Sequence, residues 1–515
     1  MDTLIQHRLR EVPIGADSGV RYGELIERRA ARQRDRTAIV YADERLTYGE
    51  LLERILLTAQ ALADRGVRRG DRVVCWSENR PEVLITLYAT MRVGAIFTPV
   101  GIASRPTDVA YILDDLAATT LLVSDQTAGQ VPEIQAAARP RILPLANISD
   151  GSFASSSTET GQRTSQGTAA DTEALVVYTS GTSGHPKGVV LTHGALFANS
   201  LNTMFGLDIV SDDVTLVNTP FSHVAALNSL AVTTLVKGGT VVIDSKFDAA
   251  RCLEQISEHK ITSMFAVPSM LALLERAPGF ATSDLSSLRW ILGGGAPMPP
   301  ALVARWSALG IPVLASYGLT EAGPSVSFRR TSEAAGKSDS SGAPALLTDL
   351  RIVGPTGEDL PVGTVGEVHV RGAHIAAGYW HNDVATEEAF RDGWLVTGDR
   401  GLIDEDGDLC ITGRSKDIVI TGGENVDPAE VEHLIVQHPK VREAAVIGRP
   451  DPLWGEIVVA VVVSDEEISL DDLQLFLRPQ LAKFKIPRAI EHRTELPRSA
   501  VGKLLRRLLN TESTD

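Results

Sequence analysis

The chain has 515 residues, of which 43% are hydrophobic and 22% charged, and its formal net charge is −16. This length exceeds what one hydrophobic core usually supports, so we expect two or more domains. The acidic balance argues against a nucleic-acid-binding surface and against docking on anionic lipid. Anionic substrates would therefore depend on a few focused cationic groups.

The three cysteines, Cys75, Cys252 and Cys410, are far apart in the sequence. This spacing fits neither a disulfide framework nor a zinc cluster. The N-terminal residues lack the apolar core of a signal peptide. No apolar run reaches the roughly 18 residues of a membrane span. We expect a cytoplasmic protein without a stable membrane anchor.

The first part of the chain alternates between helical and strand-like patterns. Apolar residues at helical spacing predict a helix from Leu46 to about Leu62. A short strand follows over 72–76, and a buried helix over 83–91 ends before Gly94. Such a βαβ rhythm predicts largely parallel sheets that are covered by helices on both faces.

Three changes in composition divide the rest of the chain. Residues 151–168 are rich in Ser, Thr, Gly and Gln, which predicts an exposed linker. From Asp349, short strands between Gly/Pro turns predict a small β-rich subdomain. After Gly413 comes a compact α/β segment. We predict an α/β protein with a large N-terminal domain, 1–413, and a small mobile C-terminal α/β domain, 414–515.

The segment from Tyr178 to Gly188 follows a buried strand and holds three glycines, four Ser or Thr hydroxyls and one lysine. Such a loop suits the phosphate groups of a nucleotide, because glycines let backbone N–H groups turn inward. It is not a Walker loop, since Lys187 is followed by Gly188 rather than by Ser or Thr. A flexible surface loop is the alternative interpretation.

Three further turns follow apolar strands. The three consecutive glycines at 293–295, followed by Ala296 and Pro297, allow a planar ligand such as a purine to approach, although a tight turn explains them equally well. Residues 316–321 combine a tyrosine that can stack on a base, a hydroxyl and a carboxylate that can hold Mg²⁺. Asp399, at another strand end, can accept both hydroxyls of a ribose, but a lone Asp is more often a turn residue.

A lysine after a glycine turn, Lys503, lies close to the C-terminus. It can project into a site that another domain forms. Taken alone, the better interpretation is a solvated basic end, because Arg506 and Arg507 follow.

Together and in this order, these segments resemble the acyl-adenylate-forming superfamily of acyl-CoA synthetases, peptide-synthetase adenylation domains and beetle luciferases. The resemblance runs from Leu46 to Lys503, and the stretches 221–227, 294–299 and 421–426 look most like bacterial fatty-acyl-CoA synthetases. It implies a two-step reaction. A carboxylate first attacks the α-phosphate of Mg·ATP to give an acyl-adenylate. The C-terminal domain then rotates, and the CoA thiol displaces AMP.

The resemblance also implies roles in binding ATP. The residues that would hold the β- and γ-phosphates are Thr179, Ser180, Gly181, Thr182, Ser183, Gly184 and Lys187. Those around adenine would be Gly294, Gly295, Ala296, Pro297 and the stacking Tyr317. Asp399 and Arg414 would bind the ribose.

Further implied roles concern the reaction itself. Thr320 would contact the α-phosphate and Glu321 the metal ion. Lys503 would bridge the carboxylate and the nucleotide in the first step, and Lys416 matches the hinge. His223 matches an aromatic gate between the acyl pocket and the thiol tunnel. The residues that would meet the pantetheine arm of CoA are Gly422, Gly423 and Trp454.

The implied acyl pocket is mostly apolar and small. Its residues are Ala225, Asn228, Val267, Met270, Gly293, Leu319, Gly323 and Val326. This lining fits a medium to long aliphatic acid or a bulky polycyclic acid, and aryl acids stay open. The matching segments have no arginine for a second carboxylate and no aspartate for an α-amino group, which disfavours diacids and amino acids.

One position departs from the family pattern. Val501 stands before the Gly502-Lys503 pair, where relatives usually carry Thr or Ser. Neutral drift is the favoured explanation, and an enzyme with weak adenylation that mainly performs the thioester step is the alternative. Other classes stay open: a luciferase-like oxygenase, or a stand-alone adenylation domain that loads a carrier protein in trans. A non-catalytic nucleotide-binding regulator is disfavoured, because Lys503 and Glu321 are both present.

Overall fold

The computed structural model describes residues 21–146, 148, 170–179, 186–296, 298–330, 340–414, 417–498 and 504–511. Its residues form two compact units. The first comprises Met1–Met204, Ile209–Lys246 and Ala373–Asp383, and the second comprises Phe205–Asp208, Phe247–Gly372 and Val384–Asp515. The predicted linker at 151–168 lies outside the described residues, and the predicted domain boundary after residue 413 stays a prediction.

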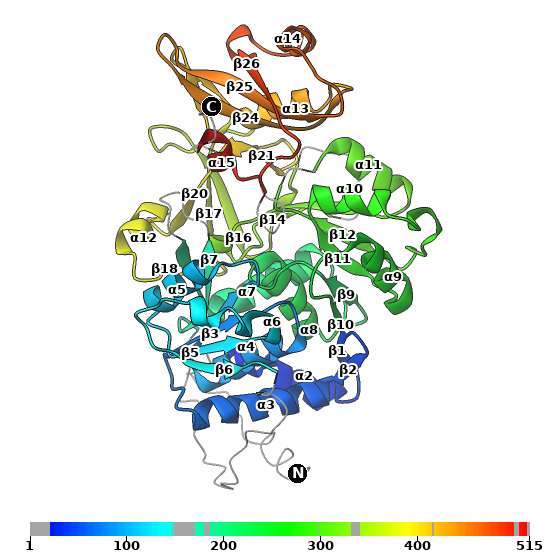
Figure 1. Ribbon diagram of the computed structural model, residues 1–515, viewed down its shortest axis with the longest axis vertical. Helices are drawn as coiled ribbons and strands as arrows, with labels where there is room; N and C mark the ends of the chain where they lie inside the picture. The colour runs from blue at the N-terminus through cyan, green and yellow to red at the C-terminus, as the bar shows by residue number, and fades with distance from the viewer. Residues whose placement is uncertain are drawn as a thin grey trace. The chain divides into compact units, whose positions relative to one another are not determined.

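A seven-stranded sheet in the first unit has the order β18-β8-β7-β4-β3-β5-β6 (Figure 1). Its strands are β3 (Arg72–Trp76), β4 (Ile96–Val100), β5 (Thr120–Val123), β6 (Arg141–Pro144), β7 (Glu173–Thr179), β8 (Lys187–Thr192) and β18 (Gly378–Tyr379). Strands β4, β3, β5 and β6 pair in parallel, as the βαβ rhythm predicts, whereas β7 and β8 pair antiparallel.

The helices of this sheet follow from the sequence pattern. Helix α4 (Pro81–Val93) connects β3 to β4, has proline at its first position and is followed by Gly94, whose φ is 81°. This left-handed residue ends the helix in the usual way. The other helical segments along this sheet are α5 (Pro106–Asp115), α6 (Asp125–Ala128) and η2 (Val131–Glu133). Residues of α5 pack into one apolar cluster with β3, β5, β7 and β8.

The first unit also holds the neighbouring strands β9-β10-β1-β2. These strands are β9 (Val214–Val217), β10 (Thr240–Ile243), β1 (Thr37–Tyr41) and β2 (Glu44–Thr47). The helical segments here are η1 (Tyr22–Glu24), α2 (Leu25–Gln33), α3 (Tyr48–Asp64), α7 (His193–Gly206), the π-helix η3 (Ala225–Val232) and α8 (Thr233–Lys237). Helix α3 begins with a capping box between Thr47 and Glu50 and corresponds to the helix predicted over 46–62.

In the second unit, strands β11 to β15 lie in chain order. They are β11 (Ser263–Ala266), β12 (Trp290–Gly293), β13 (Val313–Tyr317), β14 (Ser327–Phe328) and β15 (Ala343–Pro344). The first three are parallel neighbours, so their C-terminal ends meet at one edge. The helical segments are α9 (Ala249–His259), α10 (Pro268–Arg276), η4 (Phe280–Thr282), α11 (Pro300–Ala308) and η5 (Thr320–Ala322).

The β-rich subdomain predicted from Asp349 is an antiparallel sheet. It consists of β16 (Thr348–Val353), β17 (Gly366–Gly372), β20 (Trp394–Ile403), β19 (Phe390–Arg391) and β21 (Leu409–Arg414), with helix α12 (Asp383–Ala389) before β19. Its last two long strands carry Asp399 and Arg414 as direct cross-strand partners.

The C-terminal segment has its own sheet, of order β23-β22-β25-β24, with β26 beside β25 (Figure 1). Its elements are β22 (Val419–Thr421), β23 (Glu424–Val426), α13 (Pro428–Ile435), β24 (Val441–Asp451), β25 (Gly455–Ser464), α14 (Leu470–Leu477), η7 (Lys483–Lys485), β26 (Ala489–His492) and α15 (Arg506–Thr511). One apolar cluster joins α13 and α14 to this sheet, and a second joins α15 to it through Leu509.

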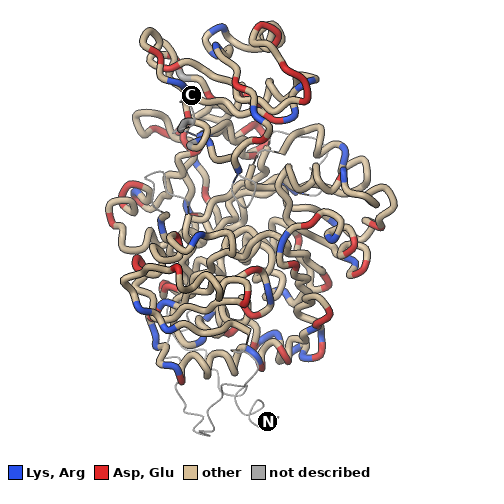
Figure 2. The backbone as a smooth tube through the Cα atoms, viewed as in Figure 1, with Lys and Arg blue, Asp and Glu red and all other residues tan. Residues whose placement is uncertain are grey.

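The predicted α/β class is therefore confirmed, with large sheets between helices, a β-rich subdomain and a smaller C-terminal α/β segment. Acidic and basic residues are interspersed along the chain (Figure 2). None of the described helices is long and apolar enough to cross a membrane.

Candidate active site

Three predicted nucleotide-binding residues meet at the end of β13. The Tyr317 hydroxyl donates a hydrogen bond to Asp399 Oδ2 at 2.6 Å, and Arg414 Nε lies 2.9 Å from Asp399 Oδ1. Each carboxylate oxygen thus has one donor. A carboxylate has about four lone-pair sites, so acceptor capacity is left for the two hydroxyls of a ribose. The resemblance assigns Asp399 and Arg414 to the ribose and Tyr317 to adenine, and the structure places all three side chains in one cluster.

The protonation states of this cluster follow from burial. The side chain of Asp399 is only 5% exposed, whereas that of Arg414 is 45% exposed. Burial, followed by the negative charge of Asp399, raises the pKa of Tyr317 well above its usual value, so its hydroxyl stays a donor. Thr397 fixes the turn before the carboxylate: its hydroxyl accepts from the Asp399 N–H at 3.1 Å and donates to Val368 O at 2.7 Å.

The predicted glycine-rich strand end lies beside this cluster in the sheet. A Cβ on Gly294 would lie 3.1 Å from both Phe265 and Ser316 Oγ, and one on Gly295, whose φ is 76°, would lie 3.3 Å from Val267. The backbone of these glycines thus lies close to apolar side chains, as a narrow site for a planar ligand requires. Sequence reasoning missed Phe265, the second-last residue of the neighbouring strand β11, which pairs with Leu292 just before these glycines. Pro297 lies outside the described residues.

The turn after Tyr317 depends on one glycine. A Cβ on Gly318 would lie 1.5 Å from Pro324 O, so no side chain fits there. This close approach sets the turn from which η5 begins with Thr320 and Glu321, both half-buried. A hydroxyl and a carboxylate in one turn supply the hard oxygen ligands that Mg²⁺ prefers. Within the described ranges, no group of three or more His, Cys, Asp or Glu side chains is placed to hold a metal ion by itself.

The predicted phosphate loop joins two antiparallel strands in the first unit. Thr179 ends β7 opposite Lys187, which begins β8. Lys187 Nζ lies 5.0 Å from the centroid of the Tyr379 ring on β18. The loop residues Ser180, Gly181, Thr182, Ser183 and Gly184 lie outside the described residues, so their predicted phosphate contacts stay predictions.

The packing at the base of this loop explains why glycine follows Lys187, at the position where a Walker loop has Ser or Thr. A Cβ on Gly188 would lie 2.9 Å from Val176 Cγ1, 3.1 Å from the Tyr178 ring and 3.3 Å from Trp380 Cβ. The backbones of Gly188 and Trp380 are also bonded, with an N–O distance of 2.7 Å. Asp115 holds both aromatic side chains, accepting from the Tyr178 hydroxyl at 2.5 Å and, through its carbonyl, from Trp380 Nε1 at 3.2 Å.

The predicted gate residue, His223, lies just before the π-helix η3. Its carbonyl accepts from the Leu227 N–H at 3.1 Å. Burial lowers the pKa of His223 to about 4, so the imidazole is neutral at physiological pH. π-Helical segments are rare and frequent at functional sites, and η3, eight residues long, carries Ala225 and Asn228 of the predicted acyl pocket.

The other predicted acyl-pocket residues belong to the second unit. Val267 follows β11, Gly293 ends β12 and Leu319 follows β13, so three adjacent parallel strands bring them together. The remaining members of this group, all buried, are Met270, Gly323 and Val326. A Cβ on Gly293 would lie 2.8 Å from Met298 Cε, so this space is already filled by an apolar side chain. Met298 was not among the predicted lining residues.

The predicted CoA-binding residues also lie together. Gly422 and Gly423 have φ values of 59° and 83°, and a Cβ on Gly422 would lie 2.8 Å from Trp454 Cε3. The Gly422 N–H donates to Trp454 O at 2.8 Å. On the Trp454 ring, the Arg488 guanidinium lies 4.0 Å from the centroid. The predicted hinge, Lys416, and the predicted catalytic lysine, Lys503, lie outside the described residues.

Comparison with known proteins identifies the family of the chain. Residues 26–380 match the family model described as "AMP-binding enzyme", and residues 430–503 match "AMP-binding enzyme C-terminal domain". The chain belongs to the AMP-binding enzyme family. A feruloyl-CoA synthase from Amycolatopsis sp is 38% identical over 481 residues, covering 93% of this chain and 96% of that protein. An indoleacetate–CoA ligase from Aromatoleum aromaticum is 36% identical, with 93% and 96% covered.

Solved structures of the AMP-binding enzyme family agree with this assignment. A fatty acyl CoA synthetase from Mycobacterium tuberculosis superposes with a TM-score of 0.77 at 32% identity, covering 96% of this chain and 98% of that one. The o-succinylbenzoate CoA synthetase from Bacillus subtilis, in complex with its acyl-adenylate intermediate, superposes with a TM-score of 0.83 at 30% identity over 94% and 97% of the two chains. The same Bacillus protein has also been solved with ATP and a magnesium ion.

These relatives confirm the predicted reaction class of this AMP-binding enzyme. It is an AMP-forming acid–thiol ligase, an ATP-dependent acyl-CoA ligase that acts through an acyl-adenylate. The resemblance to bacterial acyl-CoA ligases, stated from the motifs alone, is likewise confirmed.

Proposed function

We propose that this ligase activates a hydrophobic monocarboxylic acid bearing an aromatic ring, using ATP, Mg²⁺ and CoA in the cytoplasm. The observation that carries the nucleotide part is the cluster of Tyr317, Asp399 and Arg414 beside the glycine strand end. It joins a stacking ring to a buried carboxylate with free acceptor capacity, which is what a nucleoside needs.

The ATP-binding residues would then act as follows. Adenine stacks on Tyr317, and the ribose hydroxyls bind Asp399 beside Arg414. Thr320 contacts the α-phosphate, and Glu321 holds Mg²⁺ together with phosphate oxygens. The loop that begins at Thr179 and ends at Lys187 holds the β- and γ-phosphates, because its glycines and hydroxyls offer many donors.

The chemistry of the first step explains why the reaction needs another lysine besides Lys187 of the phosphate loop. Two anions must meet, so the barrier is largely one of charge and orientation. We assign to Lys503 the bridging of the acid carboxylate and the α-phosphate, where negative charge develops. Rotation about Lys416 then removes this lysine and brings Gly422, Gly423 and Trp454 to the CoA arm, since one site cannot hold both arrangements.

Two observations support a ring-bearing acid. The lining residues of the second unit are apolar, and all except the half-buried Leu319 are buried. Met298 fills the space beside Gly293, which favours a compact group over a long chain. Relatives with 38% and 36% identity are named for feruloyl and indoleacetate substrates. A medium to long aliphatic acid is the second candidate, because the predicted lining is apolar apart from Asn228.

A panel of acids tests this proposal. Purified protein is incubated with ATP, Mg²⁺ and CoA and with aryl-propenoic, aryl-acetic and aliphatic acids, and acyl-adenylate, thioester and AMP are quantified by mass spectrometry. We expect CoA-dependent AMP release with the ring-bearing acids. Preference for aliphatic acids would overturn the substrate class. Adenylate without CoA-dependent thioester would instead indicate carrier loading, and oxygen consumption would indicate an oxygenase.

A further inference from the structure

The C-terminal segment contains an ion-pair cluster that the nucleotide and acyl sites do not use. Arg506, the first residue of α15, lies between two acids: its Nη1 is 3.1 Å from Asp417 Oδ2, and its Nη2 is 2.5 Å from both carboxylate oxygens of Glu432. Glu432 Oε1 also accepts the Val446 N–H at 2.6 Å. We call Asp417, Glu432 and Arg506 the Arg506 cluster.

The charges in this cluster depend on one another. Burial raises the pKa of Glu432, although the nearby guanidinium opposes the shift. Burial also disfavours the charge of Arg506, but the Glu432 carboxylate outweighs this and raises the pKa of Arg506. Without the guanidinium, two carboxylates would face each other with little solvent. The planar guanidinium presents its donors to the two acids in a fixed geometry that a lysine ammonium cannot reproduce, so lysine is a poor substitute.

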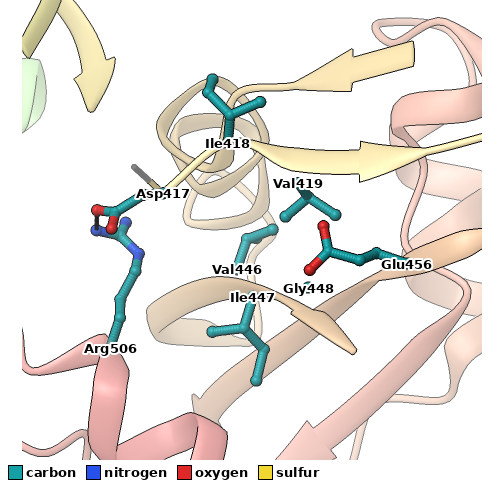
Figure 3. A pocket seen from close by; sticks show the side chains of 8 residues that line it. All are labelled: Asp417, Ile418, Val419, Val446, Ile447, Gly448, Glu456 and Arg506. Atoms are coloured by element: carbon teal, nitrogen blue, oxygen red, sulfur yellow. Dashed lines mark hydrogen bonds and ion pairs between the residues drawn. The ribbon is translucent and has the colours of Figure 1, made fainter. Parts of the chain in front are cut away.

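The cluster joins three segments that are far apart in the sequence. Asp417 directly follows the proposed hinge Lys416, Glu432 lies on α13, and Arg506 follows Lys503 by three residues. Asp417 and Arg506 face each other beside a cavity of about 100 Å³ (Figure 3). The residues that line the cavity are Asp417, Ile418, Val419, Val446, Ile447, Gly448, Glu456 and Arg506.

We propose that Arg506 is a positioning residue for Lys503 and couples it to the hinge. This inference rests on the proposed function of Lys503. Three residues span at most about 10 Å, so an Arg506 held in place limits where the lysine can reach. The same guanidinium also binds Asp417, the residue after the proposed hinge, so Arg506 links the chain that follows Lys503 to the chain that follows Lys416.

The other end of α15 is held independently, which makes the proposal testable. Arg449 Nη2 donates to Leu509 O at 2.9 Å and lies 2.9 Å from Glu491 Oε1. Leu509 is 1% exposed within the second apolar cluster of the C-terminal sheet. Helix α15 therefore keeps its packing when the contacts of Arg506 are weakened. Arg449→Lys is the matched control, since it perturbs the same helix away from Lys503.

The test separates the two half-reactions in full-length protein, with an acid that the panel identifies. Adenylation is measured as acid-dependent ATP–pyrophosphate exchange, and thioester formation is measured from supplied acyl-AMP and CoA. Arg506→Lys should lower adenylation by about 10²-fold and leave thioester formation within about threefold, because misplacement by about 1 Å costs that much. Arg449→Lys should show no such split. Adding Arg506→Lys to Lys503→Ala should cause no further loss of adenylation.

Each contrary outcome has a distinct meaning. Equal loss of both half-reactions, in parallel with a lower melting temperature, would make Arg506 merely structural and overturn the inference. If Lys503→Ala abolishes adenylation and Arg506→Lys does not reduce it, the inference fails while the proposed function stands. If Lys503→Ala spares adenylation, the proposed role of Lys503 fails and the inference fails with it.

Discussion

Replacing Tyr317 with phenylalanine tests the nucleoside cluster, because it keeps the stacking ring and removes one atom. The Tyr317 hydroxyl is one of two donors to Asp399, at 2.6 Å. A hydrogen bond to a charged group contributes about 1.5–3 kcal/mol. Arg414 remains as the second donor, so we take the lower end of that range. The change reaches ATP through the carboxylate: a less well oriented Asp399 binds a ribose hydroxyl more weakly, and a loss of about 1.4 kcal/mol lowers ATP affinity by about tenfold.

The loss should depend on the sugar. Without the Tyr317 hydroxyl, Asp399 is less well oriented for the ribose, so ATP suffers more than 2′-deoxy-ATP. The assay measures the dissociation constants of both nucleotides by calorimetry, and the preference for ATP should shrink by about tenfold. Tyr41→Phe is the control, because the Tyr41 hydroxyl has no hydrogen-bond partner within the described ranges. An unchanged preference for ATP in Tyr317→Phe would refute the reasoning.

Three further predictions concern other parts of the chain. Gly188→Ala should lower the free energy of unfolding by about 1–3 kcal/mol, because its Cβ would lie 2.9 Å from Val176. The measurement is the melting temperature. Gly129→Ala is the control and should leave the melting temperature unchanged, because its Cβ would meet nothing within 4 Å. His193 is 1% exposed, and burial lowers its pKa to about 4 from 6.5, so the folded state resists protonation. The contribution of neutral His193 to the free energy of unfolding should therefore be fully present above pH 6.5 and be lost as the pH drops toward 4, by about 3 kcal/mol at most. Thermal unfolding between pH 7.5 and 5 measures this loss, and it should be smaller in His193→Leu. Trp454→Ala should raise the KM for CoA and leave ATP–pyrophosphate exchange unchanged; a loss of exchange would contradict its proposed role.

The sequence predicts local elements well because their signals are local. Alternating apolar segments predict β3, α4 and the βαβ order, and the Gly-Lys pattern between two strands predicts the loop from Thr179 to Lys187. The glycine after that lysine is also visible in the sequence. The reason for that glycine is not visible, because Val176 becomes its neighbour only when β7 pairs with β8, and Trp380 only when β18 pairs with β8.

Contacts between distant segments could not be predicted from the residues alone. Tyr317 and Asp399 are 82 positions apart, and nothing in either motif shows that their side chains share a hydrogen bond. Phe265 and Met298 have no signal beyond being apolar, since their contacts with the glycines depend on strand register. The same holds for Arg506, which looks like a solvated basic end until α13 and Asp417 are placed beside it.

The most direct test of the two-step account is Lys503→Ala, assayed in each half-reaction. The account predicts that acid-dependent ATP–pyrophosphate exchange falls by roughly 10²–10³-fold, because a charge placed where the transition state develops is lost. Thioester formation from supplied acyl-AMP and CoA should stay within about threefold of the unchanged enzyme, since that step proceeds after the lysine has left. Equal loss of both half-reactions would contradict the account.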